Sequence, residues 1–337
     1  MNRPEGCGPL AGICAAVETN GSRAGPLERI DRLPEYSDRR LHERVIDSSD
    51  VLRRSRPGPE LPVPQLFPWI RVWYDALMTI GTGDADLEYR YASDESREHF
   101  ASGRVLYNAK GAAPFPVRLA DEMAQRCFAL LEERGHPGPY AVYDPCCGSG
   151  YLLAVIGLLH GRRIRAVIAS DIDEVMLDAA RRNLSLLTEP GMRARTEQLR
   201  ELYARYGKPS HREALESAAI LEDYRSRGAV RTIEVFPADI TAGAPDALRA
   251  SAHLPVHIVI ADLPYGNLTG WRSEGGDPAA RMLDSLFPLV QPGASVVALI
   301  ADKSLKLRHE RYRRLALFNA GKRRITLLEP LKETGRD

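Results

Sequence analysis

The sequence predicts an α/β domain built on a doubly wound, mostly parallel sheet with a C-terminal antiparallel hairpin and a helical insert. Five short apolar runs alternate with helical patterns between residues 140 and 302. The runs are YAVYD (140–144), IRAVIASD (164–171), TIEVFPAD (232–239), VHIVIAD (256–262) and SVVALIAD (295–302). They are rich in Val and Ile and continuous rather than alternating, which is typical of strands buried on both faces of a parallel sheet. Helices between such strands predict the doubly wound arrangement.

The composition limits the class of protein. A chain of 337 residues with 44% hydrophobic residues can bury one large core or two modest ones. It contains no continuous apolar run of the roughly 18 residues that a membrane helix needs, and its N-terminus lacks the pattern of a secretory signal. We therefore expect a cytoplasmic protein with no membrane partner. The net charge of +1 argues against a uniformly basic surface but leaves room for a local basic face.

The N-terminal part of the chain differs from the rest. Residues 1–60 hold six Pro, six Gly, ten Lys or Arg and ten Asp or Glu without helical or strand periodicity, which predicts a largely disordered arm. In residues 61–86 the aromatic and aliphatic side chains recur at helical spacing, which predicts a helical linker segment. The folded domain is therefore expected to occupy residues 87–337, with a helical insert at about residues 191–230.

Helices and turns inside this domain follow from the same patterns. Residues 104–108 have a strand-like pattern, and residues 117–130 place their apolar side chains mostly on one helical face, so that Cys127 is expected in the core. In the insert, residues 207–209 (GKP) separate two helical patterns, which predicts a pair of helices. Residues 315–330 contain two strand-like runs around a turn, which predicts a hairpin at the edge of the sheet.

The cysteines do not form a recognisable framework. They are Cys7, Cys14, Cys127, Cys146 and Cys147. Their number is odd, no C-x-x-C occurs, and adjacent cysteines rarely bridge each other. The eight histidines show no paired spacing with them that is typical of a tetrahedral zinc site. We therefore expect neither disulfides nor a bound metal.

The stretch DPCCGSG (144–150) follows the first predicted strand and precedes an apolar helix, which is where open α/β sheets bind nucleotides. Gly148 and Gly150 let the backbone approach a ligand because they lack a Cβ. The third glycine of a dinucleotide fingerprint is replaced by Leu153, and an aspartate precedes the turn. These departures favour S-adenosylmethionine over NAD, because Asp144 can hold the α-ammonium of that cofactor directly or through water. The alternative is a tight turn that binds no ligand.

Further aspartates follow the next two strands. Asp171 lies 23 residues after Gly148, close to the interval at which an acidic side chain binds a ribose hydroxyl pair. Asp173 is expected to cap the following helix. Asp239 can accept a hydrogen bond from the adenine amino group. The alternatives are that Asp171 and Asp173 merely cap the helix and that Asp239 lies in a solvated turn.

The fourth predicted strand continues into DLPYG (262–266), which matches the pattern of enzymes that methylate planar nitrogens. In such a turn the Asp262 carboxylate can accept a hydrogen bond from the N–H edge of the acceptor. A backbone carbonyl that Pro264 leaves free of hydrogen bonds within the turn can accept a second one. Asp262 is also placed to take the departing proton. Tyr265 can stack on the base. The alternative is a turn with no catalytic role.

Several segments together resemble one family. They are FPVRLADEM (115–123), DPCCGSGYLL (144–153), VIASDIDEVMLDAARRNLSLL (167–187), YGKPS (206–210) and DLPYG (262–266). They are similar to the AviRa family of avilamycin-resistance 23S rRNA methyltransferases, from about residue 87 to the C-terminus. The resemblance implies a Rossmann-like class I methyltransferase fold and methyl transfer from S-adenosylmethionine to N1 of one guanine in 23S rRNA. It also implies resistance to orthosomycin antibiotics that bind the large ribosomal subunit.

The resemblance assigns roles to residues as well. It places the cofactor against Asp144, Cys146, Gly148, Gly150 and Asp171, with Phe115 and Pro116 closing over its methionine end. It places the catalytic turn at Asp262, Leu263, Pro264 and Tyr265. The resemblance assigns no counterpart in the family to residues 1–86. We expect a monomer that acts on 23S rRNA or on a precursor of the large ribosomal subunit.

The catalytic turn leaves other acceptors open. A D-L-P-Y/F-G turn also resembles enzymes that methylate the exocyclic N2 of guanine in rRNA or tRNA. DNA adenine and a glutamine side chain are planar nitrogens too, but the YGKPS motif favours rRNA. A non-catalytic ribosome-binding protein on the same scaffold is a further alternative, and the intact Asp262, Pro264 and Tyr265 count against it.

A basic run follows the fifth predicted strand. Residues 301–325 contain nine Lys or Arg against two acidic residues, a local net charge of +7. Within this run, Lys303, Lys306, Arg308 and Arg311 are expected to bind RNA phosphates near the mouth of the site. The alternative is a solvated helix face. The insert is nearly balanced in charge, so we expect it to contribute shape more than charge.

Overall fold

The computed structural model describes residues 86–110, 114–264 and 277–333. The predicted arm at 1–60, and the linker segment up to residue 85, lie outside the described residues, so the proposed domain boundaries stay predictions. Among the described helices, none is both long and apolar enough to cross a lipid bilayer.

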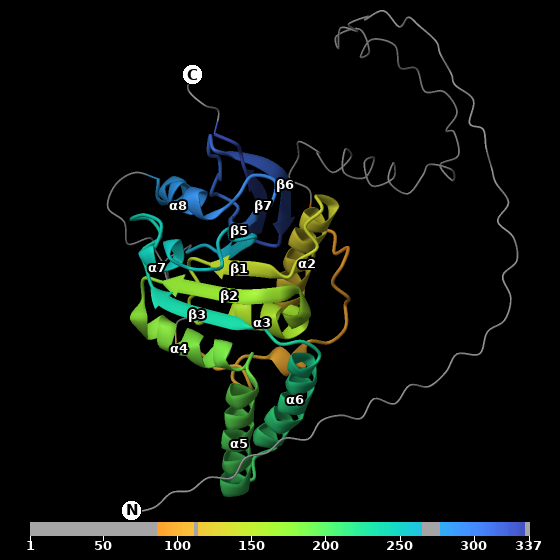
Figure 1. The fold of residues 1–337 in the computed structure, drawn as a ribbon. Coiled ribbons are helices and arrows are strands. Elements are labelled where there is room, and N and C mark those ends of the chain that lie inside the picture. Colours follow the sequence, from red (N-terminus) through yellow and green to blue (C-terminus); the bar gives the residue numbers. More distant parts are fainter. Residues whose placement is uncertain (1–85, 111–113, 265–276, 334–337) are drawn as a thin grey trace, which may run out of the picture. The chain divides into compact units, whose positions relative to one another are not determined.

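The predicted sheet is confirmed. It has seven strands in the order β3-β2-β1-β4-β5-β7-β6 (Figure 1). The strands are β1 (Tyr140–Asp144), β2 (Ile164–Asp171), β3 (Thr232–Pro237), β4 (Ile258–Asp262), β5 (Val296–Asp302), β6 (Tyr312–Ala320) and β7 (Arg323–Pro330). The first five run parallel, while β7 is antiparallel to both β5 and β6 and forms the predicted hairpin. The strand order reverses between β1 and β4, which is where sheets of this type bind ligands.

Helices cover both faces of the sheet (Figure 1). One face packs against α2 (Val117–Glu133), α3 (Tyr151–His160) and α4 (Glu174–Ser185), and the other against α7 (Asp246–Arg249) and α8 (Pro278–Leu286). Short 3-10 turns lie at Glu98–Phe100, Gly161–Arg163 and Phe287–Leu289. Both faces are apolar, which explains why the strands read as continuous hydrophobic runs.

Alternation along the strands decides which side chains share a face. Val142 and Ile260 belong to the core beneath α2, α3 and α4, whereas their neighbours Tyr143 and Ala261 belong to the core beneath α7 and α8. Because side chains alternate with a period of two, the last residues of β1 and β4 fall on the α2–α4 face. The same count places the last residue of β2 on that face, since Val167 and Ala169 lie in the same core.

The insert forms the predicted pair of helices. α5 (Glu189–Tyr206) and α6 (Pro209–Ser226) are joined at Gly207, whose φ of 60° is the left-handed conformation that ends a helix. Their inner ends reach the main core through Met192, Leu199 and Leu221. The outer ends project away from the sheet (Figure 1).

The prediction of a strand at residues 104–108 is wrong. Val105 and Leu106 are fully buried, as their apolar character suggests, but the segment pairs with side chains instead of a strand. Asn183 on α4 accepts from the Tyr107 N–H at 2.7 Å and donates to the Tyr107 carbonyl at 3.1 Å. Arg195 on α5 donates to the Val105 carbonyl at 3.0 Å. These polar side chains satisfy backbone groups that a sheet would otherwise have to satisfy.

The N-terminal described segment is held by one buried carboxylate. Glu122 on α2 accepts from the backbone N–H groups of Arg90, Tyr91 and Ala92 at 2.8 to 3.0 Å, and it pairs with Arg126 at 2.7 Å. Burial alone would raise the pKa of Glu122, but the three N–H groups and Arg126 hold it below its usual value.

Glu122→Gln removes this charge while keeping the side-chain shape. A carboxyl with a depressed native pKa stabilises the fold above its unfolded pKa of about 4.3, and that stabilisation is lost as the pH falls through the native pKa. We expect the variant to lower the free energy of unfolding at neutral pH by about 3 kcal/mol and to flatten its decline on acidification. Urea unfolding across the acid range measures both effects.

Glu133→Gln is the matched control, because Glu133 is exposed at the end of the same helix. It should leave stability and its pH dependence unchanged. A Glu122→Gln profile that runs parallel to the wild-type profile would contradict the role given to this carboxylate.

Candidate active site at the carboxyl edge of the sheet

Four aspartates gather where the parallel strands end. Asp144 ends β1, Asp171 ends β2 and Asp262 ends β4, while Asp239 follows β3. Carboxyl ends of parallel strands meet at one edge of the sheet, so these side chains are brought together by the fold. The negative charges of Asp171 and Asp262 both act on Asp144. The sequence predicts a role for each of the four separately, and the structure brings them to the same edge of the sheet.

Asp144 is the most buried of the four, with 2% of its surface exposed. Burial raises its pKa well above the ordinary value, the charges of Asp171 and Asp262 raise it further, and a 3.0 Å hydrogen bond from the Cys146 N–H only partly opposes this. An ionised carboxylate here is therefore unfavourable unless a cation lies beside it. This is the electrostatic environment that the α-ammonium of a cofactor would complete.

The two glycines of the turn do different things. Gly148, at a φ of 52°, donates its N–H to Asp171 Oδ2 at 2.8 Å, and a Cβ built on it would meet no atom of the described residues within 4 Å. Gly150, at a φ of 70°, packs against α4, where a Cβ would come within 3.0 Å of the Ala180 Cα. Gly148 therefore borders open space, as predicted for a ligand-facing residue, whereas Gly150 seats the turn on α4 and has a packing role that we did not predict.

The other aspartates already hold the backbone of their own turns. Asp171 Oδ1 accepts from the Asp173 N–H at 2.9 Å, and Asp173 Oδ1 accepts from the Val175 N–H at 2.9 Å, which confirms Asp173 as the N-cap of α4. Asp239 Oδ1 accepts from the Thr241 N–H and hydroxyl at 2.8 and 2.7 Å. A carboxylate has about four acceptor positions, so the ribose contact of Asp171 and the adenine contact of Asp239 stay predictions.

The cysteines of the turn are not reactive thiolates. Cys147 is buried and Cys146 is half-buried, and desolvation together with the neighbouring carboxylates raises the pKa of both thiols well above the ordinary value. A protonated thiol is a poor nucleophile and a poor metal ligand. Within the described ranges, no three His, Cys, Asp or Glu side chains are grouped so as to hold a metal ion. Cys127 lies in the core, as predicted.

The predicted catalytic turn begins where β4 ends. The Leu263 N–H donates to the Ile300 carbonyl on β5 at 2.8 Å and the Leu263 side chain is buried, so this residue anchors the turn and offers only its backbone to the site. Asp262 and Pro264 are half-buried. Tyr265 lies outside the described residues, and its stacking role stays a prediction.

One arginine links the two predicted halves of the site. Arg323, at the start of β7, places its Nε 3.9 Å from Asp262 Oδ1 and its guanidinium 5.5 Å from the centre of the Phe115 ring. Phe115 is buried, and the exposed Pro116 beside it is the N-cap of α2. The segment predicted to close over the cofactor therefore lies close to Asp262. Arg323 belongs to the basic run at residues 301–325, and its pattern in the sequence alone assigns it no place beside Asp262.

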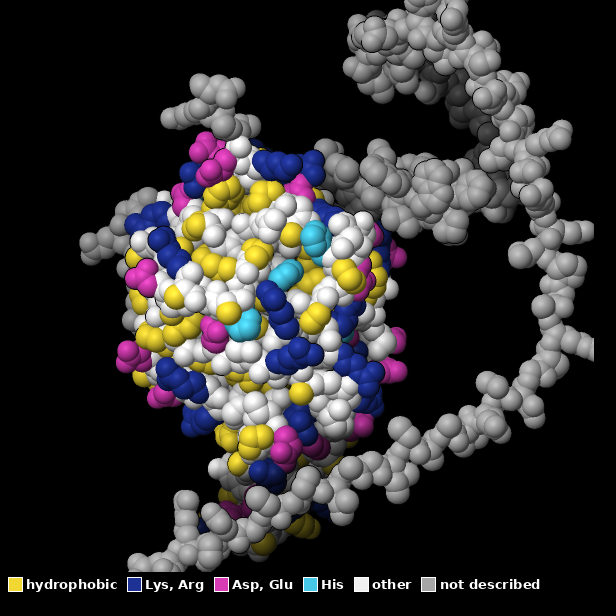
Figure 2. Space-filling view, viewed as in Figure 1, with side chains coloured by type: hydrophobic (Ala, Val, Ile, Leu, Met, Phe, Trp, Pro, Cys, Tyr) yellow, Lys and Arg dark blue, Asp and Glu magenta, His cyan; other side chains and the backbone are white. Residues whose placement is uncertain are grey.

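The four residues of the basic run that are expected to bind RNA lie in the loop between β5 and β6, so the alternative of a helix face does not hold for them. Lys303, Lys306 and Arg308 are exposed between β5 and β6. Arg311 is exposed too, but it lies 3.8 Å from Asp284 and stacks over Phe287 at 4.9 Å. In Figure 2 the Lys and Arg side chains of the described residues are spread over the visible face rather than gathered in one patch. RNA contacts of the four stay a prediction.

The strand order, the reversed last strand and the acidic glycine turn define a class I methyltransferase that uses S-adenosylmethionine. The chain belongs to the AviRa family, because the family model described as rRNA methyltransferase AviRa matches residues 87–323. This confirms the resemblance inferred from the motifs.

Three of the similar proteins and solved structures come from Streptomyces viridochromogenes. The chain is 41% identical over 232 residues to a 23S rRNA (guanine(2535)-N(1))-methyltransferase, covering 65% of this chain and 86% of that relative. Two solved structures of rRNA methyltransferase AviRa, at 2.4 and 1.5 Å, match with a TM-score of 0.62 and 38% identity. Each match covers 72% of this chain and 96% of the solved chain.

The residues of the site fit the cofactor. A Cβ on Gly148 would project into the open space that a ligand can occupy. The carboxylates of Asp144, Asp171 and Asp262 complement a ligand that carries an ammonium and a sulfonium. Asp144, Gly148 and Asp171 are the residues that would hold it. Their assignment as cofactor contacts rests on this fit and on the motif.

The raised pKa of Asp144 predicts proton-linked cofactor binding. A bound ammonium favours the ionised carboxylate, so binding releases a proton and tightens as the pH rises through the native pKa. We expect Asp144→Asn to lower the affinity about 10- to 100-fold and to remove this proton release. Calorimetric titration in two buffers of different ionisation enthalpy measures the released proton.

Asp178→Asn on α4 serves as the control, because the Asp178 side chain is exposed and pairs with Arg181 outside the site. It should bind the cofactor like the wild type. Proton release that persists in Asp144→Asn would assign the titration to another group.

Proposed function

We propose that this protein transfers a methyl group from S-adenosylmethionine to N1 of a guanine in 23S rRNA. The observation that carries the proposal is Asp262, held by the sheet at the carboxyl edge beside the Asp144 turn, in a chain of the AviRa family. The relative from Streptomyces viridochromogenes supports the choice of 23S rRNA, of guanine and of N1. The family resemblance extends the proposal to reduced susceptibility to avilamycin-type orthosomycins.

Methyl transfer to guanine N1 needs a group that accepts the N1 proton. Guanine N1 carries a hydrogen, so the nitrogen becomes nucleophilic only when that proton leaves. Asp262 is half-buried at the end of a rigid strand, where a carboxylate can accept the N1–H hydrogen bond and then the proton. Asp144, Gly148 and Asp171 would hold S-adenosylmethionine, which would supply a methyl group on a cationic sulfur and leave as the neutral thioether.

Surface features away from Asp262 support an RNA substrate. At the outer end of the α5–α6 pair, Tyr203 and Tyr206 are exposed, and Arg205 and Lys208 lie 5.4 and 6.0 Å from the Tyr206 ring. Exposed aromatic rings interleaved with cations are typical of surfaces that bind RNA by stacking and by phosphate contact. The exposed Lys303, Lys306 and Arg308 offer a second basic surface.

Product mapping tests the proposal. Purified protein and labelled S-adenosylmethionine are incubated with 23S rRNA, 16S rRNA, tRNA and DNA, and the product is mapped by primer extension and nucleoside mass spectrometry. We expect one N1-methylguanosine in 23S rRNA. Primer extension detects it because N1 methylation blocks base pairing and stops the reverse transcriptase. Asp262→Ala should abolish transfer but retain cofactor binding.

Three results would count against the proposal in different ways. N2-methylguanosine in 23S rRNA would keep the substrate and move the target atom, whereas methylation of tRNA alone would reject the rRNA assignment. Cofactor binding without transfer to any nucleic acid would favour a ribosome-binding protein on this scaffold.

The basic loop between β5 and β6 gives a separate prediction. Lys306→Glu combined with Arg308→Glu should weaken binding of 23S rRNA and lower the slope of log affinity against log salt by about two, with no change in S-adenosylmethionine affinity. Filter binding over a salt series measures the slope. Arg231→Glu with Arg249→Glu is the charge-matched control, since both are exposed beside β3. An equal loss in both double variants would indicate a general charge effect.

A further inference from the structure

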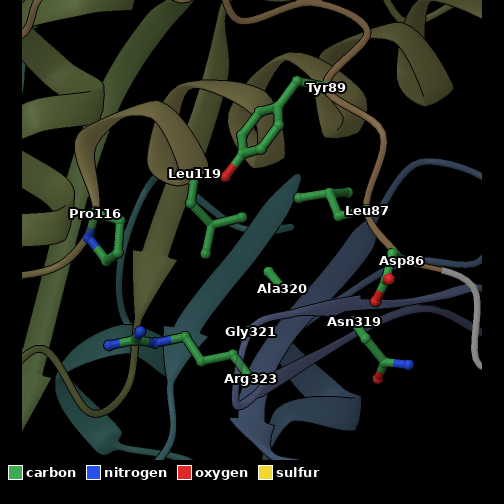
Figure 3. A pocket seen from close by; sticks show the side chains of 9 residues that line it. All are labelled: Asp86, Leu87, Tyr89, Pro116, Leu119, Asn319, Ala320, Gly321 and Arg323. Carbon is green, nitrogen blue, oxygen red and sulfur yellow. The ribbon is translucent and has the colours of Figure 1, made fainter.

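Arg323 faces both the site and an open pocket. The pocket has a volume of about 420 Å³ and lies among residues 86–89, the start of α2 and the turn between β6 and β7. Leu87, Tyr89 and Leu119 supply apolar wall. In Figure 3 the Arg323 side chain extends from β7 toward Pro116 along one side of this pocket. A substrate can therefore reach the guanidinium from outside.

Strand register fixes Arg323 relative to Asp262. Asp262 on β4 is the partner of Ile300 on β5, and Ile300 is the partner of Ile325 on β7. Ile300 and Ile325 lie in the core on the α2–α4 face, so Arg323, two residues before Ile325, projects from the same face as Asp262. The two charged side chains are held by three hydrogen-bonded strands rather than by a flexible loop.

Contacts on two sides restrain the guanidinium. Its Nε lies 3.9 Å from Asp262 Oδ1, and its carbon lies 5.5 Å from the centre of the buried Phe115 ring. The Arg323 side chain is 26% exposed. A planar group that lies over a ring and next to a carboxylate loses less freedom than an unrestrained side chain when it binds a further acceptor.

An adjacent carboxylate and guanidinium match one edge of one base. The pairing edge of guanine presents the O6 acceptor next to the N1–H donor, whereas that of adenine presents an amino donor next to the N1 acceptor. We propose that Arg323 selects guanine by donating hydrogen bonds to O6 while Asp262 accepts from N1–H. Adenine in the same position would set donor against donor and acceptor against acceptor. This inference rests on the proposed function.

The same contact stabilises the charge that develops during transfer. The N1 proton moves to the Asp262 carboxylate as the N1–methyl bond forms, and the electron pair left on the base is shared between N1 and O6. A cationic donor at O6 stabilises this charge where it appears, which lowers the barrier. Arg323 is thus a specificity-determining residue that also favours loss of the N1 proton.

The test compares Arg323→Gln and Arg323→Lys with the wild type in kcat/KM and in the dependence of kcat on pH. We expect Arg323→Gln to lower kcat about 10²-fold near neutral pH, with the deficit shrinking as the pH rises toward spontaneous ionisation of N1. Arg323→Lys should recover part of the loss because it restores the charge. Cofactor affinity and thermal midpoint should stay unchanged, which checks the fold.

Neighbouring titrations are common to all the proteins compared. The groups near the pair are Asp302 on β5, Asp144 and Asp171 at the strand ends, and Asp86 and Tyr89 in the pocket wall. Each is present in wild type and variants, so the difference between pH profiles reports the loss of Arg323. Arg324→Gln is the matched control, because Arg324 follows in the same strand and projects from the opposite face.

Two further outcomes separate this inference from the proposed function. A deficit in Arg323→Gln that is equal at every pH, or equal in Arg324→Gln, would overturn the role at O6 while leaving the enzyme a 23S rRNA methyltransferase. Substrate RNA with adenine in place of the target guanine should be inert with every protein. Failure of the wild type to methylate any guanine of 23S rRNA would reject the proposed function itself.

Discussion

Burial of the Asp144 carboxylate at the end of the central strand is the constraint on which the site depends. The group lies 2% exposed among other acidic side chains, and the protein offers it one backbone N–H. Such an arrangement is costly unless an outside cation completes it. The glycine turn that follows Asp144 leaves open space at Gly148, so the costly burial of a carboxylate and room for a ligand occur in the same turn. Stability is given up where binding recovers it.

The sequence was most informative where structure is local. β1 and β2 have the predicted bounds, because short Val- and Ile-rich runs between helical patterns are typical of strands buried on both faces. The segment 104–108 has similar local character, yet Asn183 and Arg195 satisfy its backbone from helices far along the chain. Burial could be predicted there, but pairing could not, since nothing within the segment specifies its partner.

The same distinction applies to the site. Asp144, Asp171 and Asp262 were found because each ends a recognisable strand, and parallel order does the rest. Arg323 went unassigned because its position beside Asp262 depends on the register of β5 against an antiparallel β7. Gly150 looked like a ligand glycine, but only the packing of α4 shows what its missing Cβ avoids. Site residues at the ends of parallel strands can be predicted from the sequence, whereas a site residue placed by the register between two strands can be found only from the structure.

The insert has a consequence for how a substrate is measured. α5 has 18 residues and is therefore about 27 Å long, and its contacts with the core extend as far as Leu202. Under the proposed function, Tyr203 and Tyr206 near the outer end of α5 and Asp262 at the end of β4 are two separate contact points for the RNA. A short single strand that fills one point leaves the other empty, while a folded RNA with the right spacing fills both. Selectivity for one guanine among very many would then come from the spacing of two contact points as well as from contacts with the base itself.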